Sequence, residues 1–129
     1  MEEEIIPADI SQFILQNLDA VAQLEGLLLL RANPSVSWNV RMISSRLYIS
    51  ENEASGVLAE LATRGFLKKD ADALSFKYVP VSAEIARMVD RVAHLYARCL
   101  VPVTKLIHSK SSSKIQQFAD AFRMRKDKQ

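Results

Sequence analysis

Few residues of this chain have the types and spacing that catalysis needs. Asp90 and His94 stand four positions apart, which is the spacing of one helix face, and the simplest interpretation is a surface pair rather than an acid–base dyad. Cys99 is the single cysteine and shares no metal-ligand spacing with His108, so we expect neither a disulfide nor a metal site. The three glycines lie too far apart to form a phosphate-binding loop. The sequence therefore predicts no enzyme and no cofactor.

The segment of residues 39–67 carries more information. Asn39 precedes one helical pattern of apolar residues, and Ser50 precedes another. Glu53 stands three positions after Ser50, which makes a capping box, and Gly65 provides a left-handed stop for the second helix. The order of helix, tight turn, helix and glycine stop is typical of a helix-turn-helix.

A β-hairpin is predicted directly after this segment. Its strands would be residues 66–69 and 74–79, joined by a short turn at residues 70–73. In the second strand the apolar residues alternate with polar ones and face inward, beginning with Leu74. Residues 35–38 are expected to be extended and to supply a further short strand. Such a hairpin would form a short wing.

Two helices should precede the helix-turn-helix. Asp9 is placed to cap the first and Asp19 to cap the second. The second should end near Asn33, because a residue before proline is pushed out of the helical region.

A longer amphipathic helix should follow the wing. Ser82 begins it, and its apolar face continues to residue 107. Pro102 should interrupt it near Arg98, because proline removes a backbone hydrogen bond and clashes with the carbonyl four residues earlier.

The apolar pattern from Ile43 through Leu47, Ala54, Leu58 and Leu61 to Gly65 resembles the winged helix-turn-helix superfamily. Within it, residues 20–80 are similar to small MarR-like or PadR-like transcriptional regulators of bacteria and archaea. The resemblance implies a mainly α fold, with a three-helix core, a wing and a long C-terminal amphipathic helix followed by a short one. Residues 1–80 would form the winged domain with its N-terminal arm, and residues 81–129 would form a helical extension.

The resemblance also implies a function and a set of contact residues. It implies a prokaryotic, cytoplasmic, non-enzymatic regulator that binds double-stranded DNA as a homodimer. In such folds the helix after the capping serine enters the major groove, and the wing touches the DNA backbone. The base-edge candidates carried over are Asn52, Ser55 and Glu60. The phosphate and wing candidates are Ser44, Arg46, Arg64, Lys68, Lys69 and Lys77.

The distribution of charge leaves a second function open. Residues 1–60 carry a net charge of −6 and residues 61–129 a net charge of +8. The presumed recognition helix has three glutamates against Arg64 alone, whereas phosphate binding needs cations. The alternative is a winged-helix protein-interaction module that does not bind DNA and holds a partner with its acidic helix and its last helix.

The apolar face of the long helix is a candidate dimer interface, because a long uncovered seam usually marks one. The same face would be covered within one chain if the helix folded back on the core. The interface candidates are Ile85, Met88, Val92, Leu95, Cys99, Val103 and Leu106.

The last predicted helix combines Ile115, Phe118 and Phe122 with basic residues. It is a candidate for holding a protein partner, and packing on a second subunit, phosphate binding and attachment to a membrane surface remain alternatives. We expect no membrane span, because the longest aliphatic run is residues 27–30. The acidic start lacks the basic region of a signal peptide, which favours a cytoplasmic protein.

Overall fold

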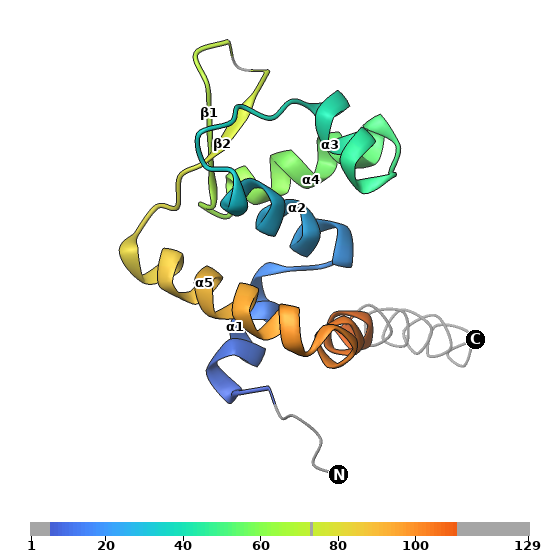
Figure 1. The fold of residues 1–129 in the computed structure, drawn as a ribbon, viewed down its shortest axis with the longest axis vertical. Coiled ribbons are helices and arrows are strands. Elements are labelled where there is room, and N and C mark those ends of the chain that lie inside the picture. The colour runs from blue at the N-terminus through green and yellow to red at the C-terminus, as the bar shows by residue number, and fades with distance from the viewer. Residues whose placement is uncertain (1–5, 73, 111–129) are drawn as a thin grey trace, which may run out of the picture.

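The computed structural model of the chain describes residues 6–72 and 74–110. It is mainly helical with one two-stranded antiparallel hairpin, so the predicted winged helix-turn-helix is confirmed (Figure 1). In chain order the elements are α1 (Ala8–Asn17), α2 (Val21–Ala32), α3 (Val40–Leu47), α4 (Glu51–Thr63), β1 (Leu67–Lys69), β2 (Phe76–Tyr78) and α5 (Ala83–Arg98). A further helix covers residues 100–110.

The elements form two groups. The hairpin, α3 and α4 make up a winged end, and α1 lies beside α5 at the opposite end (Figure 1). We call α1, α5 and the helix of residues 100–110 the base. Helix α2 lies between the winged end and the base (Figure 1). It contacts α4 and β2 of the winged end. Helices α1 and α5 thus come together, although the sequence separates them.

Two predicted helix caps, one predicted helix start and one predicted stop are confirmed. The side chains of Asn39, Ser50 and Ser82 each accept a hydrogen bond from the backbone N–H three positions further on, at 2.9, 3.0 and 3.1 Å. Gly65 has a φ of 89°, which a residue with a Cβ adopts only under strain. These local signals fix the starts of α3, α4 and α5 and the end of α4.

The two predicted aspartate caps are wrong. Helix α1 begins after Pro7 and α2 begins after Ala20, and neither has a side-chain cap hydrogen bond. Proline suits a helix start because its φ is already close to the helical value, so the helix begins before Asp9. Asp9 lies in the first turn, where its carboxylate binds Arg91 of α5, 2.5 Å away.

The wing is shorter than predicted. Lys68 and Lys77 are partners in the register of β1 and β2, and the expected further strand is a single bridge between Trp38 and Phe76. Leu74 lies outside β2 and is 72% exposed, contrary to the prediction that it faces inward. The Asp72 carboxylate accepts the backbone N–H of Leu74 at 3.0 Å, and this local turn keeps Leu74 out of the ladder.

The predicted interruption at Pro102 is confirmed, and it is a complete end of the helix. Helix α5 stops at Arg98, Cys99 leaves the helical region with φ −127° and ψ 51°, and a new helix begins at residue 100. Pro102 falls in the first turn of the new helix, where its missing N–H costs nothing. The new helix is seen nearly end-on where α5 runs across the view, so the chain turns sharply (Figure 1).

One continuous apolar core joins the winged end to the base. Phe66, at the foot of the wing, is fully buried and packs edge-to-face on Phe13 of α1, with 6.0 Å between ring centroids. Val92 of α5 and Ile107 of the following helix are also fully buried in this core. Within the described ranges no single helix has the length and apolar composition to cross a membrane. Helices α1 and α2 have that length and composition only when taken together, and they are bent by 105° relative to each other.

Candidate nucleic-acid interface

Helix α4 has one buried face and one exposed face. Its buried residues are Ala54, Val57, Leu58 and Leu61, and they pack in the core. Asn52 and Ser55 are exposed three positions apart on the other face, together with Gly56 and Ala59. Two of the three predicted base-edge residues are therefore neighbours on an open polar surface.

The turn between α3 and α4 has a feature that the sequence did not indicate. Tyr48 ends α3 in the left-handed region, with φ 57°, and its side chain is 94% exposed. Ser44 stabilises this turn, because its hydroxyl donates to the Ile49 carbonyl oxygen at 2.6 Å. Ser44 thus has a structural partner, although it was carried over as a phosphate contact.

The wing carries basic side chains close to α4 in the fold, since β1 packs against α4. Lys68 and Lys69 are exposed on β1, and Lys77 is half-buried on β2. The Lys69 ammonium lies 5.9 Å from the centre of the Phe76 ring, which is within the range of a cation–π contact.

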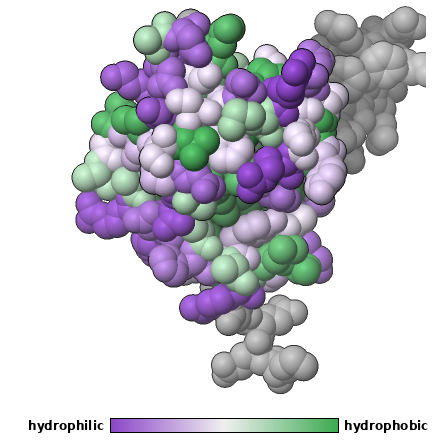
Figure 2. All heavy atoms as spheres, turned by 45° about the horizontal axis from the view of Figure 1, so that its top comes forward, coloured by the Kyte–Doolittle hydropathy of each residue, from purple (hydrophilic) through white to green (hydrophobic). Residues whose placement is uncertain are grey.

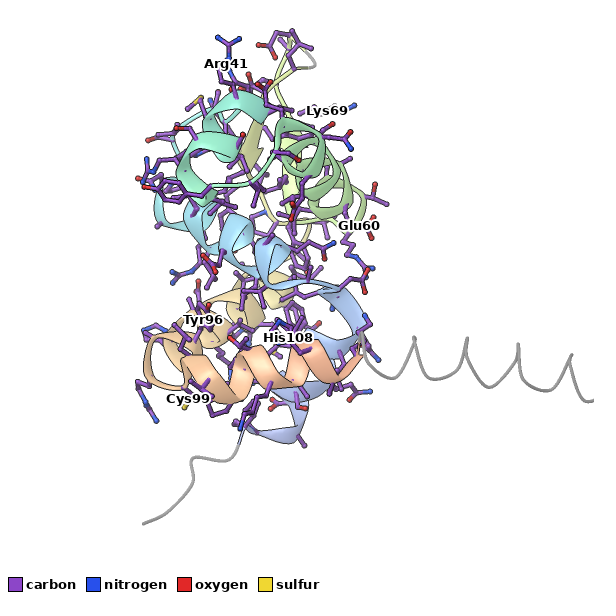
Figure 3. All side chains as sticks on the ribbon, turned by 90° about the vertical axis from the view of Figure 1, so that its right-hand side faces the viewer. Arg41, Glu60, Lys69, Tyr96, Cys99 and His108 are labelled. Carbon is purple, nitrogen blue, oxygen red and sulfur yellow. The ribbon has the colours of Figure 1, made fainter. Side chains whose placement is uncertain are left out.

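Helix α3 adds Arg46, as predicted, and Arg41, which the sequence reasoning missed. Both are exposed. Figure 3 shows Arg41 and Lys69 at the winged end, whereas Tyr96, Cys99 and His108 lie in the base. The sequence could have indicated Arg41 as a candidate contact, because it stands on the same helix as Arg46, one helical turn before Ser45.

No ion pair involves any of the five basic side chains at the winged end, as far as the structure describes the chain. They are Arg41, Arg46, Lys68, Lys69 and Lys77, and we call them the wing-end cations. Acidic residues are present nearby, since Glu51 and Glu53 are exposed in the first turn of α4. There they are favourably placed near the positive end of the helix dipole.

Arg64 and Glu60 have a different role from the predicted one. The Arg64 Nε lies 2.8 Å from Glu60 Oε1, one Nη donates to the Gln16 carbonyl at 2.6 Å, and the other lies 3.3 Å from Asp19 Oδ2. These contacts connect α4 to α1 and to the loop before α2. Glu60 also lies nearer the base than Arg41 and Lys69 do (Figure 3). We therefore remove both residues from the candidate interface.

The candidate dimer residues fall into two groups. Val92, Cys99 and Val103 are at most 3% exposed within the single chain, so the fold already covers them. Ile85, Met88, Leu95 and Leu106 are half-buried. The helix therefore folds back on the core as the alternative prediction had it, and the dimer stays a prediction. Ile115, Phe118 and Phe122 lie outside the described residues.

The other polar groups considered from the sequence form no catalytic arrangement in the described chain. The Asp90 carboxylate binds Arg31 at 2.8 Å and not His94. His94 Nδ1 lies 2.8 Å from the backbone carbonyl oxygen of Asp90. Among the described residues, no three His, Cys, Asp or Glu side chains come together as a metal site.

A view that brings the winged end forward shows its surface character (Figure 2). Hydrophilic side chains cover much of this face, and hydrophobic ones are scattered among them. This face therefore lacks the large contiguous apolar patch that an apolar docking surface would have.

Comparison with known proteins identifies the fold. No family model matches the sequence, and no curated protein matches it. A structure of a cysteine-to-serine mutant of MarR from E. coli is similar, with a TM-score of 0.51, 13% identity and coverage of 93% of this chain and 98% of that chain. The reduced form of MarR from E. coli is similar with a TM-score of 0.50, 17% identity and coverage of 92% and 95%. The described residues therefore have a MarR-like winged-helix fold.

Proposed function

We propose that this chain is a transcriptional regulator that binds double-stranded DNA, with α4 in the major groove and the wing on the backbone. The observation that carries the proposal is the group of five wing-end cations, which come from α3 and the wing and form no ion pair among the described residues. Unpaired guanidinium and ammonium groups bind phosphates by releasing counterions from the duplex. The similarity of the fold to MarR supports this proposal.

Base recognition would come from Asn52 and Ser55. An asparagine amide can form two hydrogen bonds with an adenine edge, and a serine hydroxyl can bond to several bases. Gly56 and Ala59 add little bulk beside them, so the helix backbone can approach the groove closely. Glu51 and Glu53 reduce the positive charge of the surface, so we expect weak binding to random DNA and a larger share of affinity from base contacts.

We also propose that the regulator is a homodimer in the cytoplasm of a prokaryotic cell. The half-buried residues of the base, together with Leu100 and Val101 at 55% and 57% exposure, supply apolar surface for a second subunit. A two-fold dimer would place two α4 helices on successive half-sites of an operator.

The test is titration of the full chain against random and genomic duplex DNA at low and moderate salt, with the mass in solution measured alongside. We expect a dimer whose DNA affinity falls as salt rises. Asn52→Ala should weaken only the tightest sequences, whereas replacing Lys68 and Lys69 by alanine should weaken all sequences alike. A chain that binds no duplex even at low salt would overturn the proposal and favour the protein-interaction module.

A further inference from the structure

The turn between α3 and α4 holds Tyr48 in an uncommon backbone conformation. Its φ of 57° and ψ of 44° lie in the left-handed region, and among the described residues no other residue except glycine has a positive φ. A residue with a bulky side chain is strained in this region, whereas glycine adopts it freely. The backbone N–H groups of Tyr48 and Ile49 both donate to the Ser44 carbonyl oxygen, and these bonds hold the turn.

No contact within the described chain offsets this strain. The Tyr48 side chain is 94% exposed, and its hydroxyl has no hydrogen-bond partner among the described residues. The other two tyrosines, Tyr78 and Tyr96, are half-buried. A strained backbone is retained where function requires it, so the combination of strain and full exposure indicates a side chain that serves an external contact.

Tyr48 lies beside the surface that we propose for DNA binding. It stands two positions before Ser50, which caps α4, and α4 carries Asn52 and Ser55 on its exposed face. The turn thus lies at the N-terminal end of α4, whereas the wing follows its C-terminal end (Figure 1). The major groove is only wide enough for one helix, so phosphates lie on both sides of a helix that enters it.

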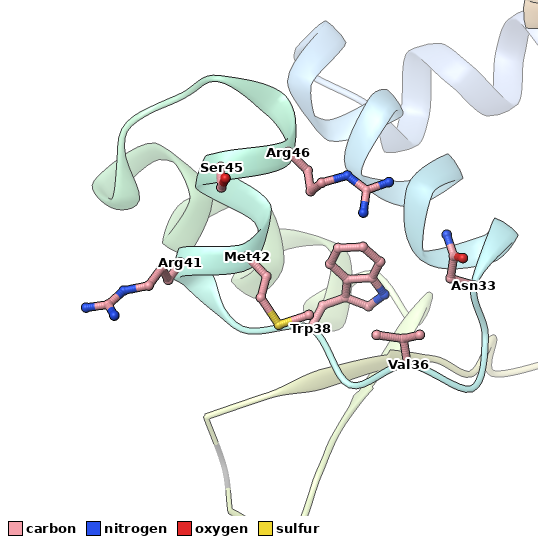
Figure 4. A pocket seen from close by; sticks show the side chains of 7 residues that line it. All are labelled: Asn33, Val36, Trp38, Arg41, Met42, Ser45 and Arg46. Atoms are coloured by element: carbon pink, nitrogen blue, oxygen red, sulfur yellow. The ribbon is translucent and has the colours of Figure 1, made fainter.

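The chain places no basic residue in this turn or in α4. Residues 47–63 contain no lysine, arginine or histidine, and Glu51 and Glu53 lie in the first turn of α4. Arg46 is close in sequence, but its guanidinium lies 5.4 Å from the centre of the Trp38 ring, on the side of α3 that faces α2 (Figure 4). An open pocket lies on that side, lined in part by Trp38 and Arg46. A phosphate at the N-terminal end of α4 therefore needs a neutral donor.

We infer that Tyr48 is a DNA-backbone contact, whose hydroxyl donates a hydrogen bond to a phosphate oxygen beside the N-terminal end of α4. The inference rests on the proposed DNA binding and adds to it a contact without charge. Tyrosine hydroxyls are among the groups that bind phosphates, and such contacts fix the position of a protein on the duplex without reading the bases. A tyrosine side chain has only two rotatable bonds, so it loses little conformational entropy on binding.

Tyr48→Phe removes only the hydroxyl and is the main test. We expect the affinity of the full chain for duplex DNA to fall about tenfold, and equally for all sequences, because a hydrogen bond to a charged group is lost. The slope of log affinity against log salt should stay unchanged, since a hydroxyl does not neutralise a phosphate. Replacing Lys68 and Lys69 by alanine should instead reduce that slope, so the experiment distinguishes the two kinds of contact.

Tyr48→Gly separates binding from structure. Glycine adopts the left-handed backbone without strain, so the urea midpoint of unfolding should stay the same or rise. The DNA affinity should nevertheless fall at least as far as in Tyr48→Phe. A merely structural role would lower stability and affinity together. Tyr96→Phe is the matched control, because it removes a hydroxyl from the base and should leave DNA affinity unchanged (Figure 3).

The inference and the proposed function fail in different ways. Equal affinity of Tyr48→Phe and the native chain would overturn the phosphate contact while leaving the proposed DNA binding intact. A loss confined to particular sequences would also overturn it, because the hydroxyl would then read a base. A native chain that binds no duplex at low salt would overturn the proposed function, and the inference with it.

Discussion

The winged end and the base use their charged residues in opposite ways. In the base and where it meets α2, basic groups bind carboxylates that are far away in sequence. The pairs are Arg31–Asp90 at 2.8 Å, Arg91–Asp9 at 2.5 Å and Lys110–Asp19 at 2.6 Å. The five wing-end cations form no such pair in the described ranges. Arg87 and Lys105 are exposed exceptions in the base and provide matched controls.

This difference indicates what each region does. Exposed ion pairs contribute little stability one by one, and those of the base lie where α1, α2 and the C-terminal helices meet. Cations without internal partners keep their charge available for an external anion. We therefore propose that the winged end, rather than the base, carries the interaction with DNA.

Replacing Phe66 by alanine should give the largest effect, because this ring joins the two regions. It is fully buried and packs on Phe13 of α1, so we expect a loss of about 3–5 kcal/mol in the free energy of unfolding. Urea unfolding followed by circular dichroism measures the loss. Leu74→Ala is the control and should change little, since Leu74 is 72% exposed. Two separate transitions would show that the regions are not one cooperative unit.

Arg64→Ala tests whether an arginine that forms ion pairs within the chain stabilises the fold and does not bind DNA. Arg64 is 24% exposed and bonds to three groups, so its loss should cost about 1–3 kcal/mol of stability. DNA affinity, measured well below the unfolding temperature, should stay unchanged. A loss of affinity without a loss of stability would return Arg64 to the interface.

Tyr78→Phe probes the contact between the wing and the base. The hydroxyl is buried without a partner among the described residues, so its removal should be neutral or should stabilise by about 1 kcal/mol. Burial, with a smaller contribution from Asp90, raises the pKa of Tyr78 above 10.0. The unfolded chain therefore loses this proton first, and stability falls as pH rises past 10.0.

The variant should lose less stability than the native chain over this alkaline range, as thermal unfolding at a series of pH values would show. Parallel losses in the two proteins would mean that Tyr78 ionises equally well in the folded state.

Gly56→Ala separates stability from binding at the winged end. A Cβ at Gly56 would meet nothing within 4 Å, so alanine should stabilise α4 by about 0.5–1 kcal/mol. If the helix backbone lies close to DNA, affinity should fall at the same time. Gly26→Ala is the contrast, because its Cβ would lie 3.0 Å from Val57 in the core. A rise in both stability and affinity would contradict close approach at Gly56.

The sequence was sufficient to predict those features of the fold that depend on neighbouring residues. The caps at Asn39, Ser50 and Ser82 and the break at Pro102 each involve groups within four positions of one another. Such signals define the elements and the order of the winged helix. Tyr48 is the exception, because no neighbouring residue indicates that its backbone adopts the left-handed conformation.

The sequence was insufficient to predict those contacts that residues far apart in the chain make. Arg64 looked like a phosphate contact because its partners Gln16 and Asp19 lie 48 and 45 positions away. The pocket beside Trp38 likewise needs the end of α2 against α3, which no local pattern reveals. The covered seam of α5 depends on α1, which the sequence assigned to the winged domain as an arm. The remaining contact residues stay predictions.

The most direct test compares two charge-matched variants. One replaces Lys68 and Lys69 by alanine at the winged end, and the other replaces Arg87 and Lys105 by alanine in the base. Duplex affinity is measured over a range of salt concentrations. Each lost phosphate contact reduces the slope of log affinity against log salt by about 0.9, so the first variant should lose up to about 1.8 and the second nothing. Equal losses in the two variants, or none in the first, would contradict the account.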